Sequence, residues 1–71
     1  MDPLSEAVVR IIRTSGGRIS ALDLSKKLVQ EGLHSDVPNA ADALKRVVGR
    51  VARTVVNQID GEMIALRPEY Q

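Results

Sequence analysis

The chain has 71 residues, a formal net charge of +1, a single aromatic residue (one Tyr, no Phe or Trp) and no cysteine. This length allows one domain at most, and its core must be built from Leu, Ile, Val and Ala. The lack of cysteine excludes disulfides, thiolate zinc sites and cysteine nucleophiles, and the shortage of aromatic rings argues against a single-strand binder that stacks bases. Because no long apolar run predicts a signal peptide or a membrane span, we expect a nuclear or cytoplasmic domain that is not secreted.

The first predicted element is an amphipathic helix that begins at Pro3. Asp2 precedes it as a candidate N-cap, and proline is well suited to the first helical position, where its missing N–H costs nothing. Gly16 and Gly17 end the helix because glycine readily adopts the positive φ of a C-terminal cap. Apolar residues recur at the helical spacing in between: Leu4, Ala7, Val8, Ile11 and Ile12.

Residues 18–19 form a short extended piece, and a second helix follows it. Ser20, with Asp23 three residues later, resembles a capping box, and Gly32 ends this helix. The residues expected to face inward are Leu22, Leu24, Leu28 and Val29. The residues expected to face the solvent are Lys26, Lys27 and Gln30.

A loop over residues 33–38 leads to the third predicted helix, residues 40–52. Pro38 disfavours helix at the preceding residue, and Asn39 can cap the new helix, with Asp42 three residues on. The predicted apolar stripe consists of Leu44, Val47, Val48 and Val51, with Ala41 adding to one end.

The pattern then changes to β-branched residues over 54–59, and Asp60-Gly61 is a strong signal for a hairpin turn. With a two-residue turn, Ile59 pairs with Glu62 and Val55 with Leu66. Val55, Ile64 and Leu66 would then share the face that closes over the helices. We expect a core over about residues 3–67 and a frayed polar tail over residues 68–71.

The element order is helix, short strand, helix, helix and hairpin. The predicted fold is therefore mainly α with a small β-hairpin: a single winged helix-turn-helix domain over residues 1–71, in which a two-stranded wing closes three helices. The alternative is a plain three-helix bundle whose third helix runs on to Gln58. The β-branched composition of residues 54–59 and the Asp60-Gly61 turn favour the winged helix.

Small and apolar residues spaced along residues 8–67 resemble the N-terminal winged-helix domain of the sosondowah family of ankyrin-repeat proteins. They are Gly16-Gly17-Arg18-Ile19, Leu44-Lys45-Arg46-Val47-Val48, Val51-Ala52, Val55-Val56, Asp60-Gly61 and Ala65-Leu66-Arg67. The chain departs from that family at Leu44, where the family has an aromatic residue, in the spacing between helices two and three, and in having no ankyrin repeats. A more distant likeness is to LOTUS domains, winged helices of germline RNA-regulating proteins. Both resemblances imply a winged helix and little about the ligand.

No catalytic constellation is evident, and we expect no enzyme activity, no cofactor, no metal and no small-molecule partner. His34 is the single histidine; Ser35 and Asp36 follow it, but adjacent residues do not face one another as a triad must. The carboxylates are scattered, and several occupy cap or turn positions. Gly16-Gly17 lacks the following Lys-Ser/Thr of a phosphate loop.

The third predicted helix is the one segment in which charged residues of one sign gather on one face. Residues 39–57 hold four bases against one acid, a balance of +3, whereas the rest of the chain has a balance of −2. Arg46, Arg50 and Arg53 recur at i, i+4 and i+7, opposite the apolar stripe, and Lys45 flanks them. The alternative is a solvated helix face, because any amphipathic helix shows polar residues to water. Gly49, beside this stripe, allows the close approach of a phosphate or a backbone, unless it serves packing against helix two.

These sequence features support two alternative hypotheses about function. The first is nucleic-acid binding to duplex DNA or structured RNA through the third helix, with Lys26 and Lys27 as further phosphate contacts. The second is a protein-interaction module or homodimer that binds no nucleic acid. The low net charge and the acidic hairpin turn favour the second, as do apolar residues that a thin core would leave exposed: Leu33, Val37, Val56 and Met63.

Overall fold

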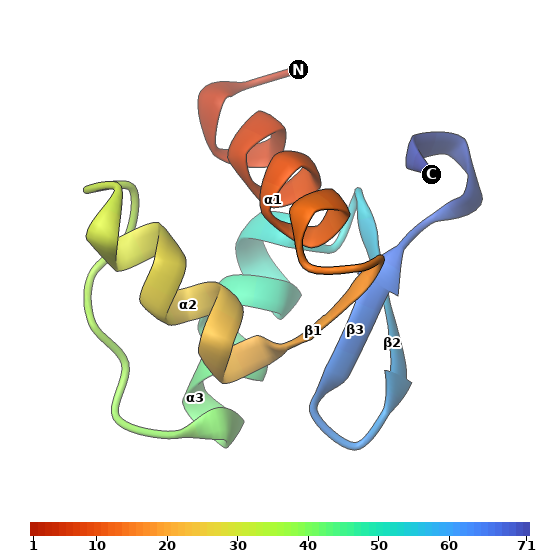
Figure 1. Cartoon of the computed structure of the whole chain (residues 1–71). Helices are drawn as coiled ribbons and strands as arrows, with labels where there is room; N and C mark the ends of the chain where they lie inside the picture. Colours follow the sequence, from red (N-terminus) through yellow and green to blue (C-terminus); the bar gives the residue numbers. More distant parts are fainter.

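The computed structural model describes the backbone of all 71 residues and every side chain except that of Gln58. Three helical segments pack against a small antiparallel sheet (Figure 1). The elements are α1 (Pro3–Thr14), β1 (Arg18–Ser20), α2 (Ala21–Gln30), α3 (Ala40–Ala43) continuing directly as the π-helix η1 (Leu44–Ala52), β2 (Val56–Asp60), β3 (Met63–Leu66) and the 3-10 turn η2 (Pro68–Tyr70).

The three predicted N-caps are confirmed. Each cap side chain accepts a hydrogen bond from the backbone N–H three residues later, which satisfies one of the donors that a helix start leaves without a partner. The pairs are Asp2 with Ser5 at 2.8 Å, Ser20 with Asp23 at 3.0 Å, and Asn39 with Asp42 at 2.9 Å. The helix starts were therefore readable from local sequence.

The core is aliphatic, as the composition requires. The predicted inward positions of α1 and α2 are largely confirmed: Ile12, Leu24 and Leu28 are fully buried, whereas Leu4, Leu22 and Val29 are half-buried. The largest fully buried apolar side chains come from α1, α2, η1, β3 and the turn before β2: Val8, Ile12, Leu24, Leu28, Val47, Val55 and Ile64.

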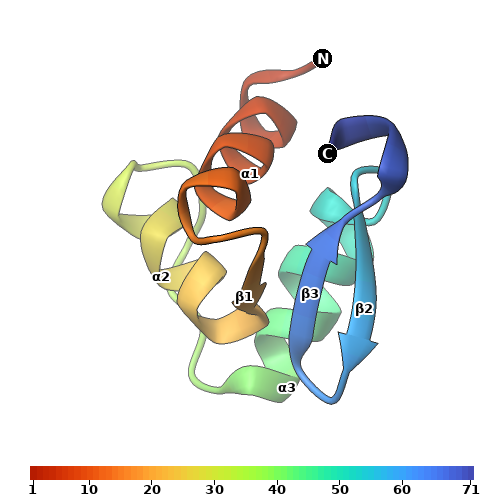
Figure 2. The same ribbon diagram turned by 45° about the vertical axis from the view of Figure 1, so that its right-hand side comes forward.

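The sheet has the strand order β1-β3-β2, with both pairings antiparallel (Figure 2). Pairing of Ile19 with Ile64 ties the short strand after α1 to the return strand of the hairpin. The three-helix-bundle alternative is wrong, because residues 56–60 form a strand. The coarser prediction, helices together with a β-hairpin, is confirmed.

The predicted hairpin register is wrong by one residue. Val56, not Val55, pairs with Leu66, and Asp60 pairs with Met63 across the turn. The turn itself is displaced to Gly61-Glu62, which shifts the pairing beside it by two residues, and the bulge between Gln58 and Asp60 reduces the shift to one residue for the pairs beyond it. Val55 precedes the strand and is still buried, and its carbonyl oxygen accepts from the Arg67 N–H at 2.9 Å.

The third helix differs from the expected α-helix. After one α turn it continues with the i→i+5 pattern of a π-helix. The buried positions accordingly recur at wider spacing, at Ala43, Val47, Val48 and Ala52. The predicted stripe is therefore corrected: Ala41 is exposed, and Leu44 and Val51 are half-buried.

The expected frayed tail is instead an ordered turn. Tyr70 in η2 packs against the core, and its carbonyl oxygen accepts a hydrogen bond from Arg13 Nη2 at 2.7 Å. Gln71 Nε2 donates to the Leu66 carbonyl oxygen at 3.2 Å. Periodicity alone could not show this, because the partners lie in α1 and β3.

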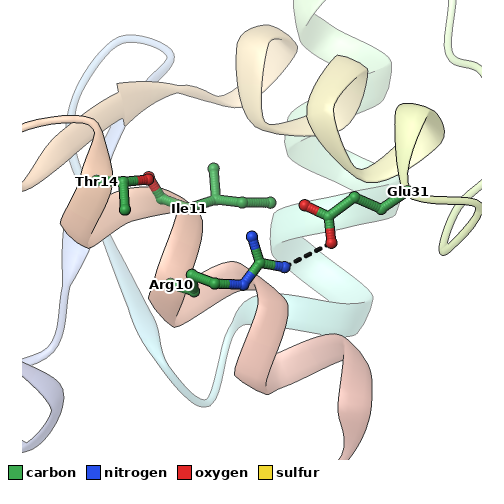
Figure 3. A network of polar contacts seen from close by, with 4 residues as sticks. All are labelled: Arg10, Ile11, Thr14 and Glu31. Carbon is green, nitrogen blue, oxygen red and sulfur yellow. Dashed lines mark hydrogen bonds and ion pairs between the residues drawn. The ribbon is translucent and has the colours of Figure 1, made fainter.

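One ion pair links the C-terminal end of α2 to α1 (Figure 3). The Arg10 guanidinium donates to Glu31, and this hydrogen bond lowers the pKa of the Glu31 carboxyl. Thr14 Oγ1 donates to the Ile11 carbonyl oxygen at 3.1 Å, in the last turn of α1. Among the described residues, no helix has both the length and the apolar character needed to cross a membrane.

Candidate nucleic-acid interface

The outer face of η1 and of the turn after it presents the predicted basic residues to the solvent. On its inner side η1 contacts both α1 and α2, and it lies behind them in Figure 1. The residues exposed on the opposite side are Lys45, Arg46, Gly49, Arg50 and Arg53, and they form what we call the η1 face. The structure thus brings together all five helix-three residues that the sequence singled out.

The wider π spacing determines how these side chains are arranged. Exposed positions recur every four residues, at 45–46, 49–50 and 53–54, between the buried positions 43, 47–48 and 52. With exposed positions recurring every four residues, Arg46 and Arg50 follow one line along η1, and Lys45, Gly49 and Arg53 follow the neighbouring line. All the predicted basic residues of the third helix are exposed, but the i, i+4 and i+7 alignment is a property of an α-helix and does not carry over to η1.

No ion pair among the described side chains neutralises the positive charge of the η1 face. Among the described side chains, the one ion pair joins Arg10 to Glu31, on α1 and just after α2. Asp42 is the sole acid on the third helix. It lies in the first turn, where a negative charge interacts favourably with the positive end of the helix dipole. The four cations of the η1 face are therefore available to an anionic partner.

Arg67, which the sequence analysis did not assign, joins the C-terminal end of this surface. Its Nε and Nη2 atoms donate to the Arg53 carbonyl oxygen at 3.1 and 2.8 Å. A guanidinium at a helix C-terminus is favoured by the helix dipole. No periodicity signals this contact, since it forms only when the hairpin returns the chain to the helix.

Gly49 lies in the middle of the π-helix η1. A Cβ atom added there would come within 3.3 Å of the Leu44 carbonyl oxygen, and no other described atom outside the adjoining helix backbone lies within 4 Å. The suggested packing of this glycine against helix two is therefore wrong. The one close neighbour of such a Cβ atom belongs to the backbone of η1 itself, and Gly49 is exposed.

Lys26 and Lys27 lie elsewhere. They line an open cleft of about 570 Å³ together with Arg18 and Met63, and none of the residues that line it belongs to α3 or η1. The structure therefore does not bring these two lysines together with the predicted helix-three site.

The features cited for a protein-interaction module are only partly present. Val37 and Val56, expected to be exposed, are buried at 6% and 3% exposure. Leu33 and Met63 are half-buried. The large exposed apolar side chains among the described residues are Met1 and Ile59, the second of which lies at the β2 bulge.

The described residues assemble no evident catalytic or metal-binding group. His34 Nδ1 donates to the carbonyl oxygen of the adjacent Ser35 at 2.7 Å, and the ring is half-buried in a loop. No cluster of three or more His, Asp or Glu side chains suited to a metal is found among them. No family model, curated protein or solved structure matches the chain.

Proposed function

We propose that this chain is a winged-helix domain that binds duplex DNA or structured RNA through the η1 face. The observation that carries the proposal is the group of Lys45, Arg46, Arg50 and Arg53, all exposed on η1 or the turn after it and without a carboxylate partner among the described residues. Lysine and arginine in such a group contact phosphates, and arginine also binds the O6/N7 edge of guanine.

The element order supports this assignment. Helix, strand, helix, helix and hairpin is the order of a winged helix, and the third helix of that fold is the one that enters the major groove. The major groove of B-DNA is about 12 Å wide, and it is the groove that admits a helix. The side of η1 away from α1 and α2 is the side free to make this contact.

The hairpin turn constrains the mode of docking. Asp60 and Glu62 are exposed beside the turn and would repel phosphates. We therefore propose that the helix and the Arg67 end of the surface contact the nucleic acid, and that the hairpin turn points away from it. Duplex or structured targets are favoured over single strands, because Tyr70 is the single aromatic residue and it packs against the core.

The test is fluorescence-polarisation binding to short duplex DNA, duplex RNA and single-stranded RNA at two salt concentrations. We expect salt-sensitive binding to a duplex that is lost in the charge-reversed variant Arg46→Glu/Arg50→Glu. A matched control, Lys26→Glu/Lys27→Glu, makes the same change of charge on α2 and should retain most of the binding. Both variants should keep the melting temperature of the parent chain, because all four side chains are exposed.

A protein-interaction function is the second candidate, and Ile59 is the observation that favours it. This side chain is 47% exposed at the bulge of β2, and β2 is an edge strand of the sheet. An edge strand with an exposed apolar residue can pair with another chain. Absence of duplex binding at low salt, together with a dimer by sedimentation that Ile59→Lys dissociates, would replace the first proposal with this one.

A further inference from the structure

A second charged surface lies apart from the η1 face. It is the open cleft of about 570 Å³ formed by β1, the outer side of α2 and the start of β3, and we call it the α2 cleft. Its volume lies in the range of ordinary ligand sites, about 300–1,000 Å³. Its lining residues are Ser15, Arg18, Ile19, Ser20, Asp23, Lys26, Lys27, Gln30 and Met63.

The lining combines a cationic rim with an apolar floor. Arg18, Lys26 and Lys27 are exposed, and none of them forms an ion pair among the described side chains. Asp23 is the one acid in the lining, so the cleft carries a formal charge of +2. Ile19 is buried and Met63 is half-buried, and they supply the apolar part.

This combination distinguishes between two kinds of anionic partner. A nucleic-acid backbone supplies negative charge but no aliphatic group for the floor, and no described aromatic side chain lines the cleft to stack a base. An acidic peptide supplies both, because an aliphatic side chain can lie on Ile19 and Met63 while the flanking carboxylates reach the rim. β1 is also an edge strand, so no further strand of this chain covers its outer side.

We propose that the α2 cleft is a docking site for a short acidic peptide segment that carries an aliphatic side chain between its carboxylates. The partner is thus a second protein, held on a surface separate from the η1 face. Arg18, Lys26 and Lys27 bind the carboxylates, and Ile19 and Met63 receive the aliphatic side chain. This inference does not depend on nucleic-acid binding, because none of its residues belongs to the η1 face.

The probe is a fluorescein-labelled peptide, Glu-Asp-Glu-Leu-Asp-Glu, titrated with the whole chain and followed by polarisation. Two control peptides separate the contributions: one with Gln and Asn in place of the acids, and one with Glu in place of Leu. We expect both to bind more weakly. Because the substitution replaces two exposed ion pairs with like-charge repulsion, Lys26→Glu/Lys27→Glu should weaken binding of the parent peptide about tenfold.

Lys45→Glu/Arg46→Glu makes the same charge change on η1 and should leave peptide binding unaltered. Amide shifts in a ¹⁵N-labelled sample should change at residues 18–20 and in α2. Equal loss of binding in the two variants, or shifts confined to η1, would overturn the proposal. Displacement of the peptide by duplex DNA or RNA from the Lys45→Glu/Arg46→Glu variant, whose η1 face is altered, would assign the α2 cleft to phosphate instead.

Discussion

Ser25 is the one buried hydroxyl in the described part of the chain whose oxygen has no hydrogen-bond partner. It lies on the inner side of α2, at 1% exposure, beside the fully buried Leu24 and close to Leu28. A buried polar atom without a partner costs about 1–3 kcal/mol relative to one that is satisfied. By contrast, Ser5 is also buried, but its hydroxyl donates to Asp2 Oδ2 at 3.0 Å.

Replacing Ser25 with alanine should therefore stabilise the domain. Ser25→Ala removes the unsatisfied oxygen and keeps the helix, so we expect a gain of about 1 kcal/mol and a melting temperature about 4–8 °C higher. Thermal unfolding followed by circular dichroism measures this. Ser5→Ala is the control and should destabilise the domain, because it removes the hydrogen bond from the Ser5 hydroxyl to Asp2. A lower melting temperature for Ser25→Ala would show that the hydroxyl has a partner.

Two carboxyl groups make the stability sensitive to acid. The pKa of Glu31 is lowered by its hydrogen bond from Arg10, and the pKa of Asp2 is lowered by its bonds from Ser5. A pKa lowered in the folded state stabilises the fold above the unfolded pKa, and this stabilisation is lost as the pH falls through the folded value. Urea unfolding from about pH 6 down to about pH 2 should show a decline below about pH 4.5.

The variant Glu31→Gln isolates the contribution of the ion pair. It should lower stability at neutral pH and make the acid decline shallower, because glutamine does not titrate. Asp36 is exposed and has no bond to another described side chain, so Asp36→Asn serves as a matched control that should leave the decline unchanged. An identical pH profile for Glu31→Gln and the parent chain would contradict the account.

At the scale of elements, helix starts and ends were predictable from local residues, whereas the hairpin register and the form of the third helix were not. Asp2, Ser20 and Asn39 act through atoms three residues away, and such signals lie in the local sequence. The bulge at Ile59 depends on pairing with β3 and on the burial of Val55 and Val56, which no local spacing specifies. The basic residues of the third helix could be predicted because only their exposure had to be inferred. Arg67 was missed because it reaches the end of the third helix only when the hairpin folds back.

The third helix contains two interleaved apolar sets. In the π form the buried positions are Ala43, Val47, Val48 and Ala52, and Leu44 and Val51 are only half-buried. An α-helix would bury the larger Leu44 and Val51 in place of the two alanines. Gly49 bears on this choice, because a Cβ atom there would approach the Leu44 carbonyl oxygen to 3.3 Å in the π form.

Gly49→Ala should therefore shift the third helix toward the α form. Alanine gains about 1 kcal/mol of helix propensity over glycine, and the contact with Leu44 opposes the π form. Backbone amide and Cα chemical shifts over residues 44–52 measure the change. Unchanged shifts over these residues would contradict the role given to Gly49.

At the scale of the whole molecule, stability depends on a small aliphatic core. A chain of this size buries only about 60% of its unfolded surface, so each core side chain is a large share of the total. Leu28 is completely buried and belongs to the cluster that joins the three helices to the sheet. The η1 face and the α2 cleft both depend on this core, although neither contributes a charged residue to it.

Leu28→Ala should cost about 2–5 kcal/mol, because it removes buried methyl groups and leaves a cavity. Such a loss is comparable to the total stability of a small domain, so we expect a large unfolded fraction at 25 °C by circular dichroism and urea titration. Met1→Ala, at a side chain 63% exposed, is the control and should change stability little. A fully folded Leu28→Ala chain would contradict this account of the core.

The central claim is that the η1 face binds a nucleic-acid duplex through several phosphates. Its most direct test is the salt dependence of the association constant K for a short DNA duplex and for a matched RNA hairpin. Four phosphate contacts predict a slope of about −3.6 in log K against log salt, and Arg46→Ala/Arg50→Ala should reduce its magnitude by about two. A slope that these substitutions leave unchanged, or no binding at low salt, would contradict the claim.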